Sequence, residues 1–131
     1  MSDTEPHPLH GFEAVALVAI GGFAGSNLRY FVDLLVGGLG ATLAVNAVGS
    51  FALGVLVYEA TTSEVIAPET RSVLATGFLS SLTTYSTFAL QSVGSTPVVL
   101  VANVVANYTL GFAGVLAART FVHRLHRRWA A

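Results

Sequence analysis

A stretch of nine residues, Ser80–Phe88, carries more hydroxyl groups than any other part of the chain. Six of the nine are Ser or Thr, one is Tyr, and none is charged. The stretch lies inside an uncharged run from residue 72 to residue 118, which is long enough to cross a bilayer twice as helix. Because lipid offers no hydrogen bonds, polar groups at this depth must be buried in protein or line a path for water or ions. We therefore expect the functional centre here.

The hydroxyl groups of this stretch can compete with the helical hydrogen bonds of the backbone. The sequence predicts a break around Ser80–Thr83, about halfway along a membrane span, where carbonyl and amide groups become exposed. Broken membrane helices of this kind commonly bind ions. The alternative is a continuous helix whose hydroxyl groups bond back to its own carbonyls.

Two further segments place polar side chains at strict four-residue intervals, which puts them on one face of a helix. One face carries Thr42, Asn46, Ser50 and Gly54, and the other carries Asn103, Asn107 and Gly111. An amide in the middle of a membrane span is costly unless it is hydrogen-bonded. Asn46 either bonds a neighbouring helix or meets a transported species, and two amides one turn apart in the later segment are harder to explain by packing alone.

The chemistry that these groups offer suits an anion. The spans contain many neutral N–H and O–H donors but no central acid or base, whereas cation paths and proton relays use titratable groups. Tyr85 and Phe88, three residues apart, can meet an ion with the electropositive edges of their rings, or can simply fill the core. Arg29, one turn from the end of the first apolar segment, either snorkels to the headgroups or attracts anions into a vestibule.

These groups must be positioned by helices that cross a membrane. The chain of 131 residues is 53% hydrophobic and only 10% charged, which is typical of integral membrane proteins. We expect an all-α protein with a single domain, residues 1–131. Its predicted spans are 11–33, 41–59, 70–93 and 98–118, followed by a basic tail, 119–131.

Several classes of function are not expected from this composition. The net charge of −1 offers no surface for nucleic acid, and the lack of cysteine excludes disulfides and thiolate metal sites. The spans contain no Ser/His/Asp set, no phosphate-binding glycine loop and no carboxylate pair. The sequence therefore does not indicate an enzyme.

Three motifs together resemble the Fluc (CrcB) family of fluoride channels. They are Gly22–Tyr30, which ends in Arg-Tyr; Ala41–Phe51, which is similar to Gly-Thr-Leu-x-x-Asn-x-x-Gly-Ser-Phe; and Gly77-Phe78 followed by Thr83–Phe88. The resemblance covers nearly the whole chain. It implies a dual-pore dimer of two antiparallel four-helix subunits in the cell membrane, which exports fluoride and so reduces its toxicity.

The resemblance also implies roles for individual residues. Asn46 would donate to fluoride with Thr42 on the polar track beside it, and Tyr85 and Phe88 would form an aromatic box. The backbone carbonyls of Ser80 and Thr83 would hold a structural sodium ion at the dimer interface. The full set of candidate fluoride-pathway residues is Arg29, Thr42, Asn46, Tyr85, Thr87, Phe88, Asn103 and Asn107.

The chain departs from the family pattern at three places. It has Ser80-Ser81 where the family usually has Gly-Gly, Tyr85 where it has Phe, and Gln91 where it has Glu. Two other functions stay open at this point. A small proton-coupled antiporter of the multidrug-resistance type would need a membrane carboxylate, for which Glu13 is the only candidate, and a non-conducting partner subunit would need no pathway.

The distribution of arginine predicts the orientation of the chain. Four spans place the 60–70 connection and both termini on one side, and that side holds Arg71, Arg119, Arg124, Arg127 and Arg128. The other side holds Arg29 at most. Since basic residues near span ends are retained inside the cell, both termini are predicted to be cytoplasmic. This imbalance favours a fixed topology and a dimer with a separate, oppositely oriented homologous subunit.

Overall fold

The computed structural model describes residues 8–62 and 65–129, and within these ranges all the regular structure is helical. The helices are α1 (Pro8–Val36), α2 (Gly38–Thr62), α3 (Pro68–Ser72), η1 (Val73–Leu79), α4 (Ser80–Leu82), α5 (Tyr85–Val93) and α6 (Pro97–Trp129). Four helical segments, Gly11–Val36, Gly38–Thr62, Pro68–Val93 and Pro97–Trp129, are long and apolar enough to cross a membrane. The predicted number of four helical segments able to span a membrane is thereby confirmed. The first seven residues and the last two lie outside the described part.

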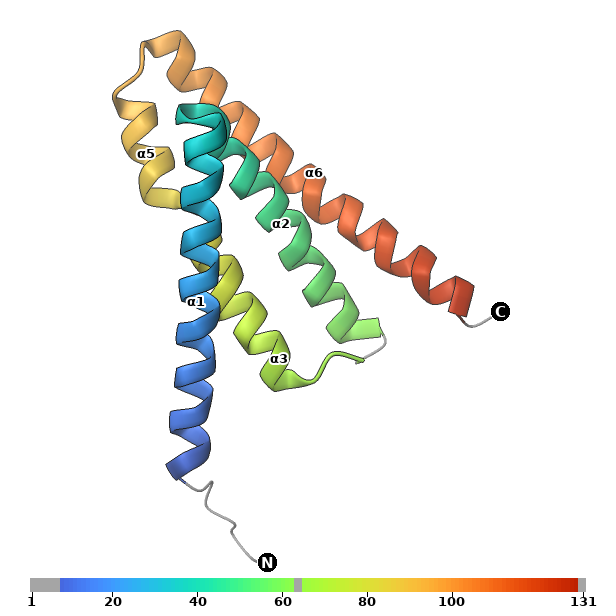
Figure 1. Cartoon of the computed structure of the whole chain (residues 1–131). Helices are drawn as coiled ribbons and strands as arrows, with labels where there is room; N and C mark the ends of the chain where they lie inside the picture. The colour runs from blue at the N-terminus through green and yellow to red at the C-terminus, as the bar shows by residue number, and fades with distance from the viewer. Residues whose placement is uncertain (1–7, 63–64, 130–131) are drawn as a thin grey trace, which may run out of the picture.

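The four segments run alternately up and down (Figure 1). The α1–α2 and α5–α6 connections lie at one end, and the α2–α3 connection lies at the other. The first of these turns is made by Gly37 and Gly38, whose φ angles are +71° and +56°. Side chains with a Cβ atom rarely adopt this left-handed backbone, so glycine permits the chain to reverse within two residues.

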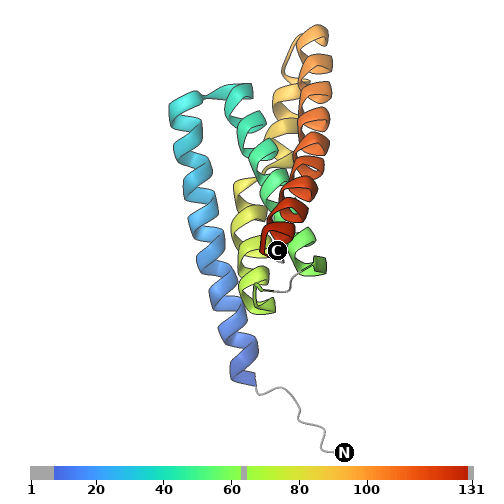
Figure 2. The same ribbon diagram turned by 90° about the vertical axis from the view of Figure 1, so that its right-hand side faces the viewer.

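The first contact between segments joins α1 to η1 and α4 (Figure 2). A Cβ atom on Gly77 would lie 2.6 Å from the carbonyl oxygen of Val18, and one on Gly25 would collide with the carbonyl of Phe78. Small residues therefore let the two backbones touch, as the spacing of Gly21 and Gly25 in the sequence indicates. We refer to this contact as the glycine seam.

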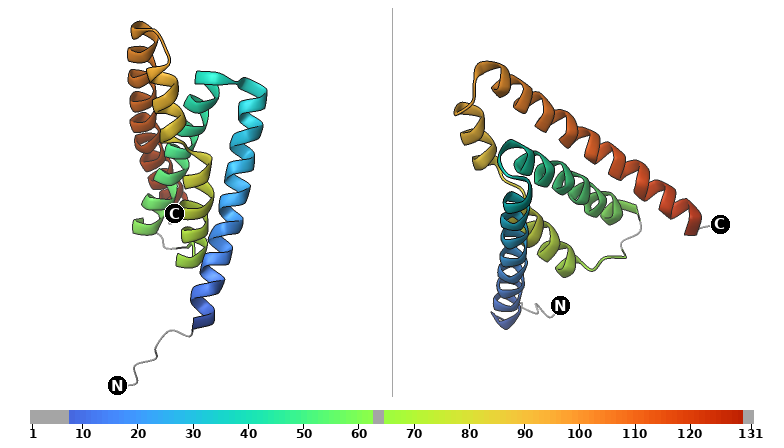
Figure 3. Two further views of the ribbon diagram at one scale, coloured as in Figure 1. Left: turned by 90° about the vertical axis from the view of Figure 1, so that its left-hand side faces the viewer. Right: turned by 45° about the horizontal axis from the view of Figure 1, so that its top comes forward.

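The second contact joins α2 to α6, which lie side by side (Figure 3). Gly54 faces Ala118, since a Cβ atom there would lie 2.9 Å from the alanine side chain. The rings of Phe51 and Phe121 are 6.1 Å apart. Because this packing continues to the buried Val122, α6 does not end near residue 118 but extends through the basic segment to Trp129.

The third segment departs most from a regular helix. Residues Val73–Leu79 form a π-helix, which the sequence does not predict, and α4 is followed by two residues with extended backbone. These residues, Thr83 (ψ 158°) and Thr84 (φ −149°, ψ 118°), are called the extended pair below. The hydroxyl groups of Ser80 and Thr83 donate back to the carbonyls of Thr76 and Leu79, respectively.

Candidate ion pathway

Asn46 of α2 holds the peptide backbone at the extended pair. Its Oδ1 accepts from the amide of Thr84 at 2.8 Å, and its Nδ2 donates to the carbonyl of Thr84 at 3.1 Å and to Oδ1 of Asn107 at 3.2 Å. In a continued helix the Thr84 amide would donate to the carbonyl of Ser80 four residues earlier. The side chain of Asn46 takes the place of that helical partner, so the partly buried amide at mid-span has hydrogen-bond partners for both its N–H groups and its oxygen.

A line of hydrogen bonds continues from Asn46 through α6 to α5. Nδ2 of Asn107 donates to Oδ1 of Asn103 at 2.9 Å and to its carbonyl at 3.0 Å. Nδ2 of Asn103 donates to Oγ of Ser92 at 2.9 Å, and that hydroxyl donates to the carbonyl of Phe88 at 2.7 Å. We call Asn46, Asn107, Asn103 and Ser92 the amide ladder. It connects three helices through neutral groups only.

A cavity of about 550 Å³ opens beside the ladder. Of the candidate residues it is lined by Asn46, Ser80, Thr83, Tyr85, Phe88 and Asn107. The rings of Tyr85 and Phe88 lie 5.8 Å apart at 50°, and a third ring, Tyr108, meets Phe88 edge-on at 6.4 Å. Phe88 is 8% exposed and Tyr85 is 75% exposed. One ring of the pair thus belongs to the protein interior, and the other stands at the open side of the cavity.

A second cavity, of about 250 Å³, shares Thr84 with the first. Its lining includes Arg29, Thr42 and Thr87, the remaining candidates apart from Asn103, and also Asp33 and Gln91. Nη1 of Arg29 donates to the carbonyl of Thr83 at 3.3 Å. The guanidinium group therefore lines this cavity and contacts the backbone of the extended pair.

Three residues that the structure places at this site are missing from the predicted set. Thr84 lines both cavities, and its Oγ1 accepts from the amide of Thr87 at 3.2 Å, which caps α5. Ser92 ends the amide ladder, and Asp33 places a carboxylate beside Arg29. Thr84 stands within the hydroxyl-rich stretch and could have been chosen from it. Ser92 carries no signal in the sequence, because its partner Asn103 meets it only across the α5–α6 turn.

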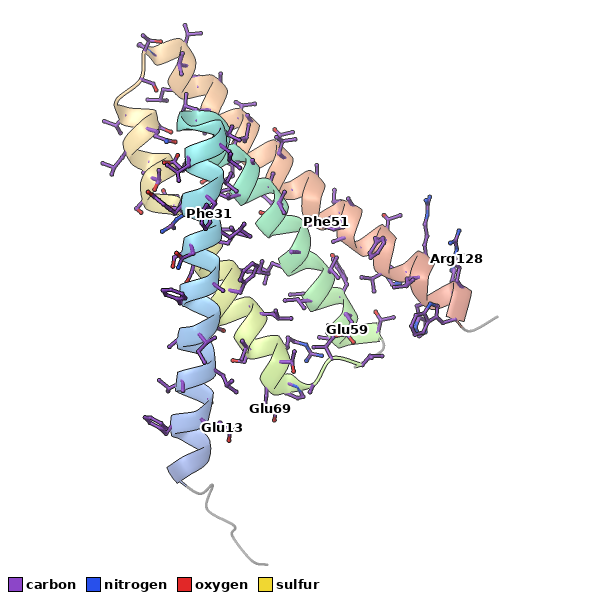
Figure 4. All side chains as sticks on the ribbon, in the orientation of Figure 1. Glu13, Phe31, Phe51, Glu59, Glu69 and Arg128 are labelled. Carbon is purple, nitrogen blue, oxygen red and sulfur yellow. The ribbon has the colours of Figure 1, made fainter. Side chains whose placement is uncertain are left out.

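Two glutamates, Glu13 and Glu59, line neither cavity of the pathway. Glu13 is exposed near the start of α1 and lines none of the three cavities (Figure 4). Glu59 pairs with Arg71 at 3.3 Å and accepts from the amide of Ile66 at 3.0 Å, which ties down the α2–α3 connection. An antiporter mechanism that requires a carboxylate at the centre of the membrane receives no support from Glu13.

Comparison with known proteins agrees with this arrangement. Residues 16–122 match the family described as "CrcB-like protein, Camphor Resistance (CrcB)". A protein of Haloarcula marismortui, named fluoride-specific ion channel FluC 1, is 59% identical over 93% of this chain and 94% of its own length. Fluoride-specific ion channel FluC 2 of Halobacterium salinarum is 51% identical over 81% and 84%, and FluC 2 of Methanosarcina mazei is 37% identical over 94% and 98%. The chain belongs to the CrcB family.

Proposed function

We propose that this chain is a subunit of a fluoride-specific ion channel, a multi-pass protein of the cell membrane that lets fluoride leave the cytoplasm. The named relatives support this function over most of their length and of this chain's length. The observation that carries it is the neutral amide donor of Asn46 at the extended pair, next to two aromatic rings, inside a chain with four helices that can cross a membrane. Such a site suits a small anion that sheds its water.

The proposed pathway passes through both cavities, with Arg29, Thr42 and Thr87 in the lining of one and Asn46, Asn107, Tyr85 and Phe88 in the lining of the other. Asn103 lines neither cavity and contributes to the pathway by accepting a hydrogen bond from Asn107. Both Nδ2 hydrogens of Asn46 already have acceptors. We infer that fluoride, as a strong acceptor, replaces Oδ1 of Asn107 at the longer of the two bonds while the bond to the Thr84 carbonyl persists.

The direct test uses purified protein in liposomes loaded with fluoride. An electrode follows fluoride release after a potassium ionophore is added to balance the charge. We expect rapid release that requires the ionophore and that chloride does not share. A protein that releases no fluoride but takes up a cationic drug in exchange for protons would contradict the proposal and support the antiporter.

The subunit is proposed to work as a dimer with an antiparallel arrangement. The first cavity is open on one side, and the large apolar side chains Phe112, Tyr85 and Leu90 are exposed around this part of the molecule. A second subunit covering this face would enclose the cavity. The broken third span would then place the carbonyls of Ser80 and Thr83 at the interface, where we propose that they hold a sodium ion. The Thr83 carbonyl would bind the ion through the lone pair that does not accept from Arg29.

Sodium dependence tests the metal proposal. Ser80→Ala and Thr83→Ala should change fluoride efflux little, because both hydroxyl groups bond back to their own helix and leave only the carbonyls as ligands. Replacing sodium on both sides by N-methyl-glucamine should weaken the dimer or stop efflux. Unchanged assembly and efflux after exhaustive removal of sodium would exclude the site.

The uneven arginine distribution supports a fixed topology with cytoplasmic termini and a homologous partner subunit of opposite orientation. The chain has no cysteine, so one cysteine added at the C-terminus is a unique label. In intact cells it should resist an impermeant maleimide and react after lysis. A large fraction labelled from outside, or a fully active dimer of this chain alone, would contradict the paired-subunit proposal.

A further inference from the structure

We propose that Ser92 and Asn103 are positioning residues, which control the orientation of the Asn46 amide and the geometry of the extended pair through Asn107. The inference deepens the proposed channel function and rests on it for its transport readout. Neither residue lines the two cavities of the pathway. Ser92 is 6% exposed and Asn103 is 7% exposed, so both act from the interior rather than by touching the ion.

All the hydrogen bonds of the amide ladder run in one direction. The single proton of Ser92 goes to the carbonyl of Phe88, so its Oγ is left to accept from Nδ2 of Asn103. That contact turns Oδ1 of Asn103 toward Asn107, which donates to it. Asn107 then presents its own Oδ1 to Nδ2 of Asn46. Each amide thus bonds its neighbour in the same sense, and the series begins at a hydroxyl group on α5. Backbone groups add to this order, since Asn107 also donates to the carbonyl of Asn103 and Asn46 also donates to the carbonyl of Thr84.

The other end of the ladder reaches the backbone of the proposed pathway. With Nδ2 turned toward Asn107, Asn46 offers Oδ1 to the amide of Thr84. If the Asn46 amide were reversed, an NH₂ group would face that backbone N–H, and two donors would meet without an acceptor. Buried polar groups left unpaired in this way are costly, and a chain of aligned bonds strengthens each member. The ladder therefore favours one of the two orientations of Asn46.

Removing the hydroxyl group of Ser92 should weaken the alignment of the amide side chains, beginning at the end of the ladder that is farthest from Asn46. In Ser92→Ala, Nδ2 of Asn103 loses its only side-chain acceptor, and the orientation of this amide is then selected only by its bond from Asn107. We expect fluoride efflux to fall about tenfold, which corresponds to the loss of one buried hydrogen bond. We also expect the Thr84 amide to exchange with solvent deuterium faster.

The chain offers a matched control one turn away. Ser95 also donates to the carbonyl four residues before it, that of Gln91, at 2.6 Å, but it receives no bond from an asparagine. Ser95→Ala should leave both efflux and the exchange of Thr84 unchanged. Ser92→Thr retains the hydroxyl group and should restore most of the activity lost in Ser92→Ala. Ser92→Cys, with a weaker acceptor of similar size, should lie between them and replaces Ser92→Ala if that variant does not assemble.

A double variant tests whether Ser92→Ala lowers efflux through the amide ladder or through a general loss of stability. In an Asn103→Leu background the ladder is already interrupted, so adding Ser92→Ala should cause little further loss of efflux. The proposal would be overturned if the two substitutions reduced fluoride efflux independently and additively. It would also be overturned if Ser95→Ala accelerated the exchange of the Thr84 amide as much as Ser92→Ala does. If the wild-type protein passes no fluoride, the channel function fails, but the ladder is still judged by whether Ser92→Ala deprotects Thr84.

Discussion

The helices of this subunit form two halves that are held together in different ways: α1 with η1 and α4, and α2 with α5 and α6. At the glycine seam, α1 and η1 touch through backbone atoms, and a Cβ atom on Gly77 would already be 2.6 Å from a carbonyl oxygen. On the other half, α2, α6 and α5 are connected by the side-chain hydrogen bonds of the amide ladder. The glycine seam requires residues without a Cβ atom, whereas the amide ladder requires particular hydrogen-bond donors and acceptors. Close packing holds the first half, whereas in the second half directed hydrogen bonds are added to close packing such as that of Gly54 against Ala118.

The extended pair lies where the two halves meet, and each half binds one of its residues. Arg29 on α1 donates to the carbonyl of Thr83, and Asn46 on α2 bonds both the amide and the carbonyl of Thr84. Two residues that have left the helix are thus fixed from both sides. The proposed ion pathway is therefore sensitive to changes in either half, but for different physical reasons.

The largest effect is expected from adding one methyl group to the seam. Gly25→Ala places a Cβ atom against the carbonyl of Phe78, and backbone atoms cannot move aside without separating α1 from η1. We expect a loss of about 3 kcal/mol or more of folding free energy. The measurement is the yield of monodisperse protein in size-exclusion chromatography. Gly11→Ala on the same helix meets no atom within 4 Å and should behave like the wild type.

A change in the ladder should remove function and spare the fold. Asn46→Asp has no N–H to give to Asn107 or to the carbonyl of Thr84, and it places a negative charge where an anion must pass. The loss of these two partly buried hydrogen bonds corresponds to a decrease of efflux of about a hundredfold. Asn27→Asp, an exposed amide that bonds only the carbonyl of Phe23, is the control. Wild-type efflux from a well-assembled Asn46→Asp protein would exclude Asn46 from the pathway.

Variants of Arg29 separate two effects of this side chain: its positive charge and its hydrogen bond to the backbone of Thr83. Arg29→Gln removes the positive charge from the second cavity and should slow efflux about threefold at low ionic strength, with less effect at high salt. Arg29→Lys keeps the charge and should be close to the wild type. An equal loss in both variants, independent of salt, would mean that Arg29 acts only through its bond to Thr83.

The smallest effect is expected where the α2–α3 connection joins the two halves. Glu59→Gln removes the ion pair with Arg71 and leaves an oxygen to accept from the amide of Ile66. Since both charged groups are partly exposed, we expect the midpoint of thermal unfolding to fall by only about 3 °C, with efflux unchanged. A loss of efflux without a loss of stability would show that this connection takes part in conduction.

The parts that could be predicted from the sequence depend on local patterns. Apolar length predicts the four spans, the Gly37-Gly38 pair predicts the first turn, and four-residue spacing places Asn103 and Asn107 on one face. The partners of these amides depend on how α5 folds back on α6, and Ser92 has no local feature that distinguishes it from Ser95. The π-helix of η1 could not be predicted for the same reason: its residues, Val73–Leu79, form an ordinary apolar segment with no local feature that distinguishes a π-helix from an α-helix.

Trp129, at the end of the extended α6, is the only tryptophan in the chain and is exposed. All intrinsic tryptophan fluorescence of the protein therefore comes from one known position, beyond the apolar part of the last span. A water-soluble quencher added outside sealed vesicles would dim only those subunits whose C-termini face outward. The chain thus contains its own optical reporter of insertion direction, which requires no label and no substitution.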